Sequence, residues 1–394
     1  MRARLTTSRR VLGVDVARGL ALIGMMSVHI FPAFRADGSL HPSYAVAAGR
    51  SAALFAVLAG VGLALSTGGP KRYDGRRLRG ARAGVLARAG LLVGLGLLLG
   101  QVDSPPLVIL AYYGLLFLVA IPFLGLPVRA LVVLAVLSAT LAPALSHLAR
   151  MHLDVAPVGD PGGTTLFTEL LLTGTYPVLP WTTYLFVGLA LGRLDLRSRA
   201  TALWLLGGAV VLAVGAKAIS SALLDAAGGA ERLRASIPAD PGYAFLRRNL
   251  AGRLDAGLFG TTPATDWRWL LISSPHSGTV FDLVHTSATA AGLLGLCLLF
   301  TRQAPRWVAL PLVATGSMTL TLYTVHVLAL ADGSPLLLTD NRLQLWLAHL
   351  TTAMVVATLW RALLGRGPME GLAAKLDRAA RQLVEGRPHS ARGR

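Results

Sequence analysis

The feature that most constrains this chain is a series of long apolar stretches separated by short polar connections. A helix needs about 20 predominantly apolar residues to cross the hydrocarbon core of a bilayer, and about ten such stretches occur along the 394 residues. They cover residues 11–34, 46–66, 81–100, 107–124, 128–149, 177–194, 200–225, 279–300, 309–331 and 344–364. The stretches 107–124 and 177–194 are short or carry prolines. The sequence therefore predicts an all-α fold, a polytopic transmembrane helix bundle.

The composition agrees with a membrane environment. Only 14% of the residues are charged and the mean hydropathy is +0.60, whereas soluble domains carry roughly 25% charged residues. The formal net charge is +18, which in a soluble protein would indicate nucleic-acid binding. Here the basic residues gather in short connections between apolar stretches, so we expect a lipid bilayer and no nucleic acid as the partner.

The distribution of basic residues predicts the orientation, because short loops rich in Lys and Arg stay in the cytoplasm. Basic residues occur at the N-terminus and after every second predicted span, at Arg2, Arg4, Arg9, Arg10, Lys71, Arg72, Arg76, Arg77, Arg79, Arg82, Arg129, Arg193, Arg197, Arg199, Arg302, Arg306 and after Arg361. The alternate connections 101–106 and 332–342 are nearly free of them. We therefore expect a multi-pass protein of the plasma membrane with both termini in the cytoplasm.

The N-terminal apolar stretch must also be weighed as a signal peptide. It carries Asp15 and Arg18, and no small-x-small cleavage site follows it. Both features favour a retained first span.

The predicted organisation has four parts. Residues 1–225 form a first membrane region with seven spans, 226–278 a long outer loop, 279–364 a second membrane region with three spans, and 365–394 a basic, amphipathic cytoplasmic tail. Leu246, Leu250 and Leu254 recur every four residues in the long loop, which predicts a short helix on the outer leaflet or over a cavity. Residues 368–385 predict either an interfacial helix on anionic inner-leaflet lipid or a solvated tail.

Small residues predict where helices approach each other closely. Gly90, Gly94 and Gly100 form one such pattern, and Gly60 forms another with Ala56 and Ala64.

Several classes of site are missing from the sequence. There is no G-x-S-x-G, H-E-x-x-H or P-loop motif. The single cysteine, Cys297, excludes an internal disulfide, and no Cys/His spacing suits a metal. We expect Cys297 to be a small packed apolar residue, and no metal cofactor.

Ionisable residues within the predicted spans are few and therefore informative, since each costs about 2.5–3.5 kcal/mol at the centre of a helix. Asp15 and Arg18 lie three residues apart near the cytoplasmic end of the first span. They form either an intrahelical ion pair that allows both to be buried, or an inner-leaflet site in which Arg18 contacts the phosphate of an anionic cofactor.

Four histidines are predicted near the outer half of the bilayer. His29 ends the first span, His41 follows in the first outer loop, and His285 and His326 lie in the eighth and ninth spans. Asp282 precedes His285 by three residues, a spacing that suits a carboxylate orienting an imidazole. Each histidine is either a hydrogen-bonded structural residue or part of a common cavity.

Aromatic residues mark two further positions. Tyr44 follows His41 in the first outer loop, and Tyr176 and Trp181 open the sixth span from the outside. The tyrosine and tryptophan are either interface anchors or substrate contacts.

These residues resemble a known family. The stretch Arg10-Val-Leu-Gly-Val-Asp-Val-Ala-Arg-Gly-Leu-Ala-Leu-Ile-Gly-Met25 is similar to the opening of heparan-α-glucosaminide N-acetyltransferase-like membrane proteins. His41-Pro-Ser-Tyr44, leading into Leu54 to Gly60, and Tyr176-Pro-Val-Leu-Pro-Trp181, followed by Gly192-Arg193, also resemble that family. Gly316 to Tyr323, with His326, is similar to a related bacterial membrane family.

The resemblance implies a transmembrane acyltransferase that takes an acetyl group from cytosolic acetyl-CoA and passes it to an acceptor on the far side. In this sequence His41 best matches the family's histidine in the first outer loop. The candidate supporting residues are Asp282 with His285, or His326, and the candidates on the cofactor side are Asp15 and Arg18. An imidazole can deprotonate an amine or hydroxyl or carry the acyl group, and basic loops can attract CoA.

The acceptor is expected to be an envelope sugar, amine or lipid-linked molecule, and a homodimer is compatible with the sequence. The first outer loop is short, with no evident sugar-binding aromatic residue beyond Tyr44, so heparan itself is not expected.

Two other functions stay open. A transporter or exporter could use the same histidine, Asp and Arg groups for proton coupling, and a non-catalytic scaffold is the third. Binding of acetyl-CoA separates the acyltransferase from the transporter.

Overall fold

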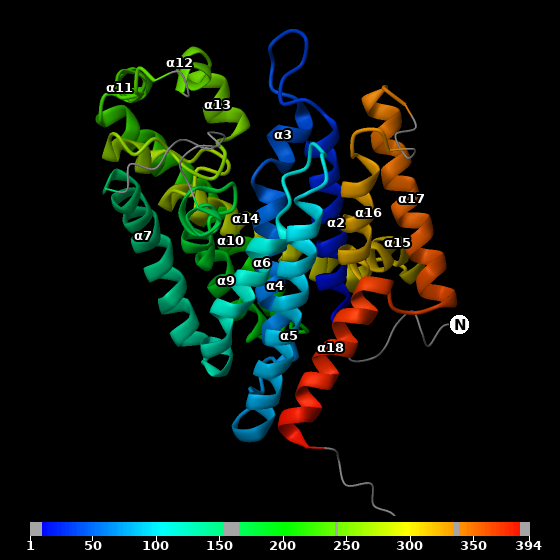
Figure 1. The fold of residues 1–394 in the computed structure, drawn as a ribbon. Helices are drawn as coiled ribbons and strands as arrows, with labels where there is room; N and C mark the ends of the chain where they lie inside the picture. The colour runs from blue at the N-terminus through cyan, green and yellow to red at the C-terminus, as the bar shows by residue number, and fades with distance from the viewer. Residues whose placement is uncertain (1–9, 153–164, 241–242, 335–338, 387–394) are drawn as a thin grey trace, which may run out of the picture.

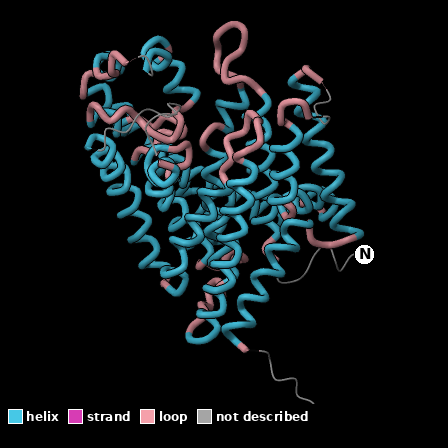
Figure 2. The backbone as a smooth tube through the Cα atoms, viewed as in Figure 1, coloured by secondary structure: helices cyan, strands magenta, loops and turns pink. Residues whose placement is uncertain are grey.

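The chain is described by a computed structural model that covers residues 10–152, 165–240, 243–334 and 339–386. These residues form an all-α helix bundle, as predicted, and contain no β-strand beyond the isolated bridge between Phe34 and Leu40 (Figures 1 and 2). Parts of the predicted N-terminal basic segment, the loops 150–176, 226–278 and 332–342, and the end of the tail lie outside the described residues.

The helices follow the apolar stretches closely. The first half of the bundle consists of α2 (Leu12–Ile30), α3 (Pro42–Ala47), α4 (Arg50–Ser66), α5 (Gly75–Leu99), α6 (Leu110–Ala120), η1 (Ile121–Gly125), α7 (Val128–His152), α8 (Leu166–Thr168), η2 (Glu169–Thr173), α9 (Val178–Gly192) and α10 (Arg199–Ala226). The second half consists of α11 (Gly229–Ala235), α12 (Ala244–Arg248), α13 (Leu250–Ala256), η4 (Trp267–Leu271), α14 (Val280–Gln303), α15 (Arg306–Gly316), α16 (Thr319–Ala329), α17 (Arg342–Leu363) and α18 (Pro368–Glu385).

Each predicted span has a helical counterpart. Within the described residues, seven helices are long and apolar enough to cross a membrane, and an eighth is reached if α15 and α16 count as one span. The two shorter apolar helices, Leu110–Gly125 and Val178–Gly192, match the two predicted stretches that are short or proline-containing. The chain is a multi-pass bundle, while the number of ten spans stays a prediction.

The two ends of the bundle differ in charge. We call the end with the connections 67–74, 193–198 and 364–367 the basic end, and the end with 31–41 and 257–279 the loop end. The start of α2 and the helix α18 both lie at the basic end (Figure 1). This arrangement agrees with the charge bias from which a cytoplasmic location was predicted.

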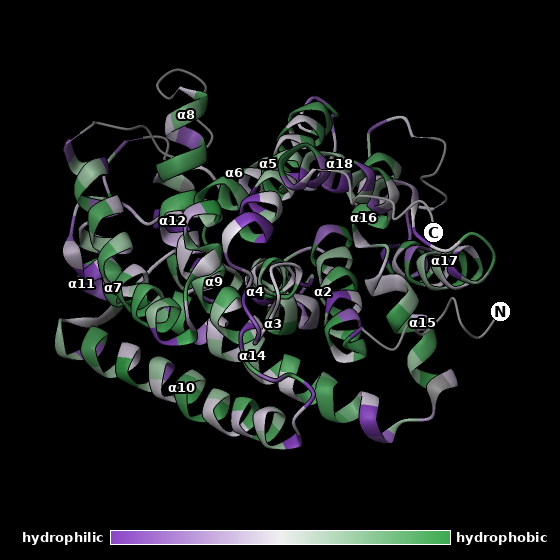
Figure 3. Ribbon diagram, turned by 90° about the horizontal axis from the view of Figure 1, so that it is seen from below, coloured by the Kyte–Doolittle hydropathy of each residue, from purple (hydrophilic) through white to green (hydrophobic). Residues whose placement is uncertain are grey.

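The interior of the bundle is formed by α2, α4, α9 and α14, whose residues are largely buried. The peripheral helices α7, α10 and α17 expose large apolar side chains instead, including Trp204 and Val211 of α10 and Leu359 of α17. Figure 3 shows α10 at the outside of the bundle with mostly apolar residues. In a bilayer these side chains face lipid.

Close helix contacts confirm one of the two small-residue predictions. A Cβ atom on Gly60 would lie 2.6 Å from the carbonyl oxygen of Leu185, and one on Gly188 would overlap that of Val57, so α4 and α9 touch backbone to backbone. The prediction for Gly90 and Gly94 is wrong, because both face open space.

The long outer loop builds its own small core. Leu233, Leu250, Trp269 and Ile272 are buried there, with Leu246 and Leu254 packed against them. The predicted amphipathic helix exists as two short pieces, α12 and α13, that break at Asn249. The leucine face of α12 and α13 packs on protein. This packing favours the predicted helix over a cavity and not the one on the outer leaflet.

The C-terminal helix α18 packs along α5 (Figure 1). A Cβ atom on Gly84 of α5 would collide with the carboxylate of Asp377, so the glycine makes room for α18. The structure thus shows a docked helix, and neither predicted alternative included this contact with α5.

The ninth predicted span is broken. Its two halves, α15 and α16, are bent by 70°, and Gly316 at the break fits directly against the backbone of Asp15 in α2. Irregular backbone at membrane depth is tolerated where it is buried in protein or lines a cavity. The break in fact lies beside a cavity.

Candidate functional site

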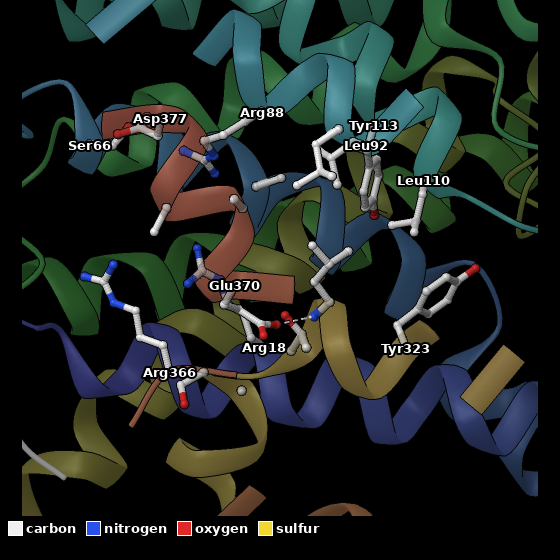
Figure 4. Close-up of a pocket in the computed structure, with 18 of the residues that line it drawn as sticks. Arg18, Ser66, Arg88, Leu92, Leu110, Tyr113, Tyr323, Arg366, Glu370 and Asp377 are labelled. Atoms are coloured by element: carbon white, nitrogen blue, oxygen red, sulfur yellow. Dashed lines mark hydrogen bonds between the residues drawn. The ribbon is translucent and has the colours of Figure 1, made fainter. Parts of the chain in front are cut away.

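A cavity of about 780 Å³ opens near the basic end between α2, α4, α5, α6, α16 and α18 (Figure 4). Ligand pockets commonly measure about 300–1,000 Å³. We call it the arginine cavity. Among the described residues, seven arginines line it against two carboxylates: Arg10, Arg18, Arg88, Arg361, Arg366, Arg378 and Arg381, with Glu370 and Asp377. The surplus of cationic side chains suits an anionic ligand.

The Asp15–Arg18 pair forms as predicted and stands at the wall of this cavity. The carboxylate of Asp15 lies 3.6 Å from the Arg18 guanidinium and 3.4 Å from that of Arg10. Arg18 also donates to the carbonyl of Leu58 at 3.3 Å. The interpretation as an intrahelical ion pair is confirmed, since Asp15 is buried. Arg18 also lines the cavity, and its contact with a cofactor stays a prediction.

The α18 wall places further cations. Arg381 forms an ion pair with Asp377 at 2.8 Å and donates to the carbonyl of Ser66 at 3.4 Å. On the facing α5, the guanidinium of Arg88 lies 5.2 Å from the centre of the Phe117 ring. Arg366 and Arg378 are exposed. The cavity thus combines anchored arginines with freely hydrated ones.

Glu370 fastens α18 to the start of α16. Its carboxylate accepts the backbone N–H of Leu320 at 2.7 Å and of Thr321 at 3.1 Å, and the Thr321 hydroxyl at 2.6 Å. These bonds satisfy N–H groups that a helix start leaves without partners. They hold α16 in place at the cavity wall.

The opposite end of the cavity is apolar and aromatic. Figure 4 shows Tyr113, Tyr323 and Leu110 away from Arg88 and Arg366. The Tyr113 hydroxyl donates to the carbonyl of Ala52 at 3.1 Å, and the Tyr323 hydroxyl accepts the N–H of Ile109 at 3.3 Å. The Tyr113 hydroxyl uses its proton in this bond, whereas the Tyr323 hydroxyl accepts and still has its own proton to donate, so this deep end suits an apolar or weakly polar group.

Two of the predicted histidines meet just beyond the deep end. His29 follows cavity-lining Met25 by one helical turn on α2, and His326 follows Tyr323 by one turn on α16. His29 Nδ1 lies 3.2 Å from His326 Nε2, and His349 of α17, which the sequence analysis missed, stacks edge-on against His326. His326 Nδ1 and His349 Nε2 are buried without a hydrogen-bond partner, so this histidine cluster has unused polar atoms.

His41 lies on the other side of α2, in a second cavity of about 640 Å³. We call this cavity the His41 groove. The imidazole ring of His41 stacks on Phe31. His41 is the N-cap of α3, and its Nδ1 accepts the backbone N–H of Ser43. The neutral ring in this arrangement carries its proton on Nε2. A proton on Nδ1 would instead be accepted by the Ser43 hydroxyl oxygen, 2.8 Å away, which would leave Nε2 free to act as a base.

The predicted Asp282–His285 pair does not form. His285 Nδ1 donates to the carbonyl of Ala213 at 3.0 Å, and its Nε2 faces an Arg50 nitrogen at 3.4 Å. The carboxylate of Asp282 accepts the N–H of Gly278 at 3.1 Å. Asp282 sits in the first turn of α14, where the unpaired N–H groups of the loop and helix start compete for its oxygens.

Tyr44, Tyr176 and Trp181 line neither the arginine cavity nor the His41 groove. The Tyr44 hydroxyl donates to the carbonyl of Val28 at 3.2 Å. Tyr176 and Trp181 are buried rather than exposed at a membrane interface, and they contact His276, a loop residue that the sequence analysis missed. Burial lowers the pKa of His276 to about 4, so this imidazole is neutral at physiological pH.

Arg193, part of the family-like pattern, is a structural residue. It is buried and donates to the carbonyls of Ala64 and Gly69 at 3.0 Å each and to the Thr67 hydroxyl at 3.0 Å. It thereby satisfies backbone groups at the end of α4.

No group of His, Cys, Asp and Glu suited to a metal occurs in the part of the chain that the structure describes. Cys297 is buried, with a free thiol.

The comparisons with known proteins address the same region. The catalytic-domain model of heparan-alpha-glucosaminide N-acetyltransferase matches residues 10–217, more than half of the chain. No curated protein matches. The matched segment runs from the start of α2 into α10 and includes Asp15, Arg18 and His41, whereas α16 and α18 complete the arginine cavity from outside it. The chain is therefore a multi-pass membrane protein that belongs to the heparan-alpha-glucosaminide N-acetyltransferase catalytic-domain family.

Proposed function

We propose that this protein transfers an acyl group, in the first place acetyl, from cytosolic acyl-CoA to an amine or hydroxyl on the outer side of the plasma membrane. The observation that carries the proposal is the arginine cavity, a cationic, membrane-embedded pocket that opens near the basic end in a member of an N-acetyltransferase family.

The residues of the cavity fit acetyl-CoA. Arg88, Arg366 and Arg378 are the candidates to hold the phosphates of CoA, since arginine forms charge-assisted, two-pronged bonds with phosphate. The less polar arm of CoA would lie along Phe55, Leu92 and Tyr113. Arg18, which pairs with Asp15, lies between Arg366 and Tyr113 (Figure 4).

The depth of the cavity suits delivery across the membrane. From Ser66 to Phe55, both of which line it, α4 advances about 16 Å at 1.5 Å per residue. That equals about half of the 30 Å hydrocarbon core. A thioester at the deep end would thus lie near mid-membrane, one helical turn from His29 and His326.

The proposed chemistry is acyl transfer with a histidine base. The C–S bond of the thioester breaks and a C–N or C–O bond forms, while the acceptor proton passes to an imidazole and the leaving thiolate takes up a proton. We assign the acceptor-side role to His41, as the family resemblance implies. Because His41 and the arginine cavity lie on opposite sides of α2, the acyl end of CoA must reach past α2 to the acceptor for the transfer. The His29–His326 pair lies on the thioester side of α2, where an imidazole that has taken up a proton from water can pass that proton to the thiolate, while the proton taken by His41 leaves to water on the outer side.

One structural feature favours a transporter, namely the broken α15–α16 pair, because discontinuous helices form transport sites. In such sites the free N–H groups at a half-helix start bind the substrate. Here the N–H groups of Leu320 and Thr321 are already taken by Glu370 of the same chain. The acyltransferase is therefore the better supported function.

Calorimetry of acetyl-CoA binding to the purified protein tests the proposal. We expect saturable binding that Arg18→Ala weakens. We also expect His41→Ala to retain binding but lose transfer. His41→Asn is the matched variant, because asparagine keeps the α3 N-cap without an imidazole. Transfer retained in His41→Asn would refute the base role, and no binding to folded wild type would refute the function.

A further inference from the structure

The His41 groove shares no lining residue with the arginine cavity, in which we propose that acetyl-CoA binds. The lining of the groove indicates what kind of molecule the groove can hold. The groove and the arginine cavity are both lined by α2 and α4, but by opposite faces of these two helices. Gly24 and Ser27 of α2 and Leu54 of α4 line the groove, whereas Met25 and Phe55 line the arginine cavity.

The lining of the groove is mostly apolar, and its ionisable side chains lie at the loop end. These are His41 and Arg50, which lie there with Ser43 and the apolar Phe31 and Val46. Deeper in the bundle the lining is formed by Leu20, Ile23 and Leu293. From Leu20 to Phe31, α2 advances about 16 Å. A ligand that matches this lining has a polar head at the loop end and a hydrocarbon tail that points to mid-membrane.

The groove adjoins the lipid-facing surface. α14 and α17 each contribute to its lining and pack against α2 from different sides (Figure 3). Val46 at its rim is 73% exposed. Leu296, one turn from the lining residue Leu293, and Leu343, one turn from Trp346, are also exposed. A membrane lipid can therefore reach the groove sideways from the bilayer.

Arg50 gives the polar end a positive charge. Its guanidinium donates to the carbonyl of Ala45 at 2.8 Å and faces His285 Nε2 at 3.4 Å. These bonds use two of the five N–H donors of an arginine. Phosphate is the head-group anion that membrane lipids offer and that a guanidinium binds well.

We propose that the acyl acceptor is a phosphate-bearing membrane lipid whose head group carries an amine or hydroxyl. Its tail lies in the His41 groove, its phosphate pairs with Arg50, and its nucleophile faces His41. This inference rests on the proposed function and narrows its acceptor from any outer-side nucleophile to an amphiphile. A soluble sugar or amine would leave the apolar half of the groove unused.

The test uses phosphatidylethanolamine with a photoreactive diazirine in its tail, reconstituted with the full-length protein in nanodiscs. We expect cross-links on α2 and α14 peptides that contain groove residues. Leu293→Trp fills the groove and should lower this labelling about tenfold, which corresponds to about 1.4 kcal/mol. Leu296→Trp, on the exposed face one turn away, should leave it within about twofold. Equal labelling in both variants would overturn the proposal.

A second pair of measurements separates the tail from the phosphate. Glycerophosphoethanolamine, which has the same head group and no tails, should fail to compete with the labelled lipid. Arg50→Gln should reduce labelling, and Arg50→Lys should restore most of it. Full competition by the tailless compound would show that the groove recognises a soluble phosphate ester, and the lipid assignment would fall.

Calorimetry with acetyl-CoA on the same samples keeps the two proposals distinguishable. Both Trp variants should bind acetyl-CoA like wild type, because Leu293 and Leu296 do not line the arginine cavity. Lipid labelling without acetyl-CoA binding would refute the proposed transferase and leave a lipid site. Acetyl-CoA binding without groove labelling would refute the lipid acceptor alone.

Discussion

The arginine cavity makes a quantitative prediction for Arg88→Gln. Arg88 projects from α5 toward α18 and is only partly exposed, with its guanidinium over the Phe117 ring. A hydrogen bond to a charged group contributes about 1.5–3 kcal/mol, and each 1.4 kcal/mol is tenfold in affinity. The loss of one phosphate contact at Arg88 should therefore weaken acetyl-CoA binding about ten- to a hundredfold.

The assay is calorimetric titration of acetyl-CoA into detergent-purified protein at fixed ionic strength. Arg302→Ala is the matched control, since Arg302 is an exposed arginine near the basic end outside the cavity. It should bind within about twofold of wild type. Arg88→Lys should bind between wild type and Arg88→Gln, because lysine keeps the charge without the fork geometry. If Arg88→Gln and Arg302→Ala weakened binding equally, the cationic wall would act only through the overall charge, and the reasoning would fail.

Three further predictions concern stability. Arg193→Ala should lower the free energy of unfolding by about 3 kcal/mol or more, because several buried carbonyls lose their hydrogen-bond donor. Thermal melts measure this loss, and Arg129→Ala, at an exposed arginine, is the control. Gly188→Ala should cost about 1–3 kcal/mol by overpacking α9 against α4, whereas Gly208→Ala, in open space on α10, should be neutral or stabilising. The pKa of His276 falls from 6.5 to about 4 on folding. The unfolded state therefore takes up its proton first, and up to about 3 kcal/mol of stability is lost between pH 6.5 and 4. His276→Asn, which tolerates the left-handed backbone there, should have a smaller decrease in melting temperature over that range.

Much of the fold can be predicted from the sequence, because a helix that crosses a membrane requires a long apolar stretch. The bounds of α10 (Arg199–Ala226) and α14 (Val280–Gln303) lie close to the predicted spans 200–225 and 279–300. The 70° bend between α15 and α16 was missed, because hydropathy does not change where the chain turns beside a cavity. The docking of α18 was also missed, since an amphipathic pattern shows that a face exists and not what covers it.

The candidate site was predicted in part. The spacing of Asp15 and Arg18 predicted their pairing correctly, since i,i+3 neighbours share a helix face. The shared depth of His29 and His326 indicated that they could meet. The same spacing rule failed for Asp282 and His285, where nearby N–H groups and the Ala213 carbonyl compete for both side chains. The walls supplied by α5, α16 and α18 depend on long-range packing, which no local pattern encodes.

The most direct test of the central claim is a cryo-EM structure of the protein in nanodiscs with saturating acetyl-CoA. The account predicts density in the arginine cavity, with the phosphates among Arg88, Arg366 and Arg378 and the acyl end beside Tyr323 below the His29–His326 pair. Density for acetyl-CoA at another place, or an empty arginine cavity at saturation, would contradict it.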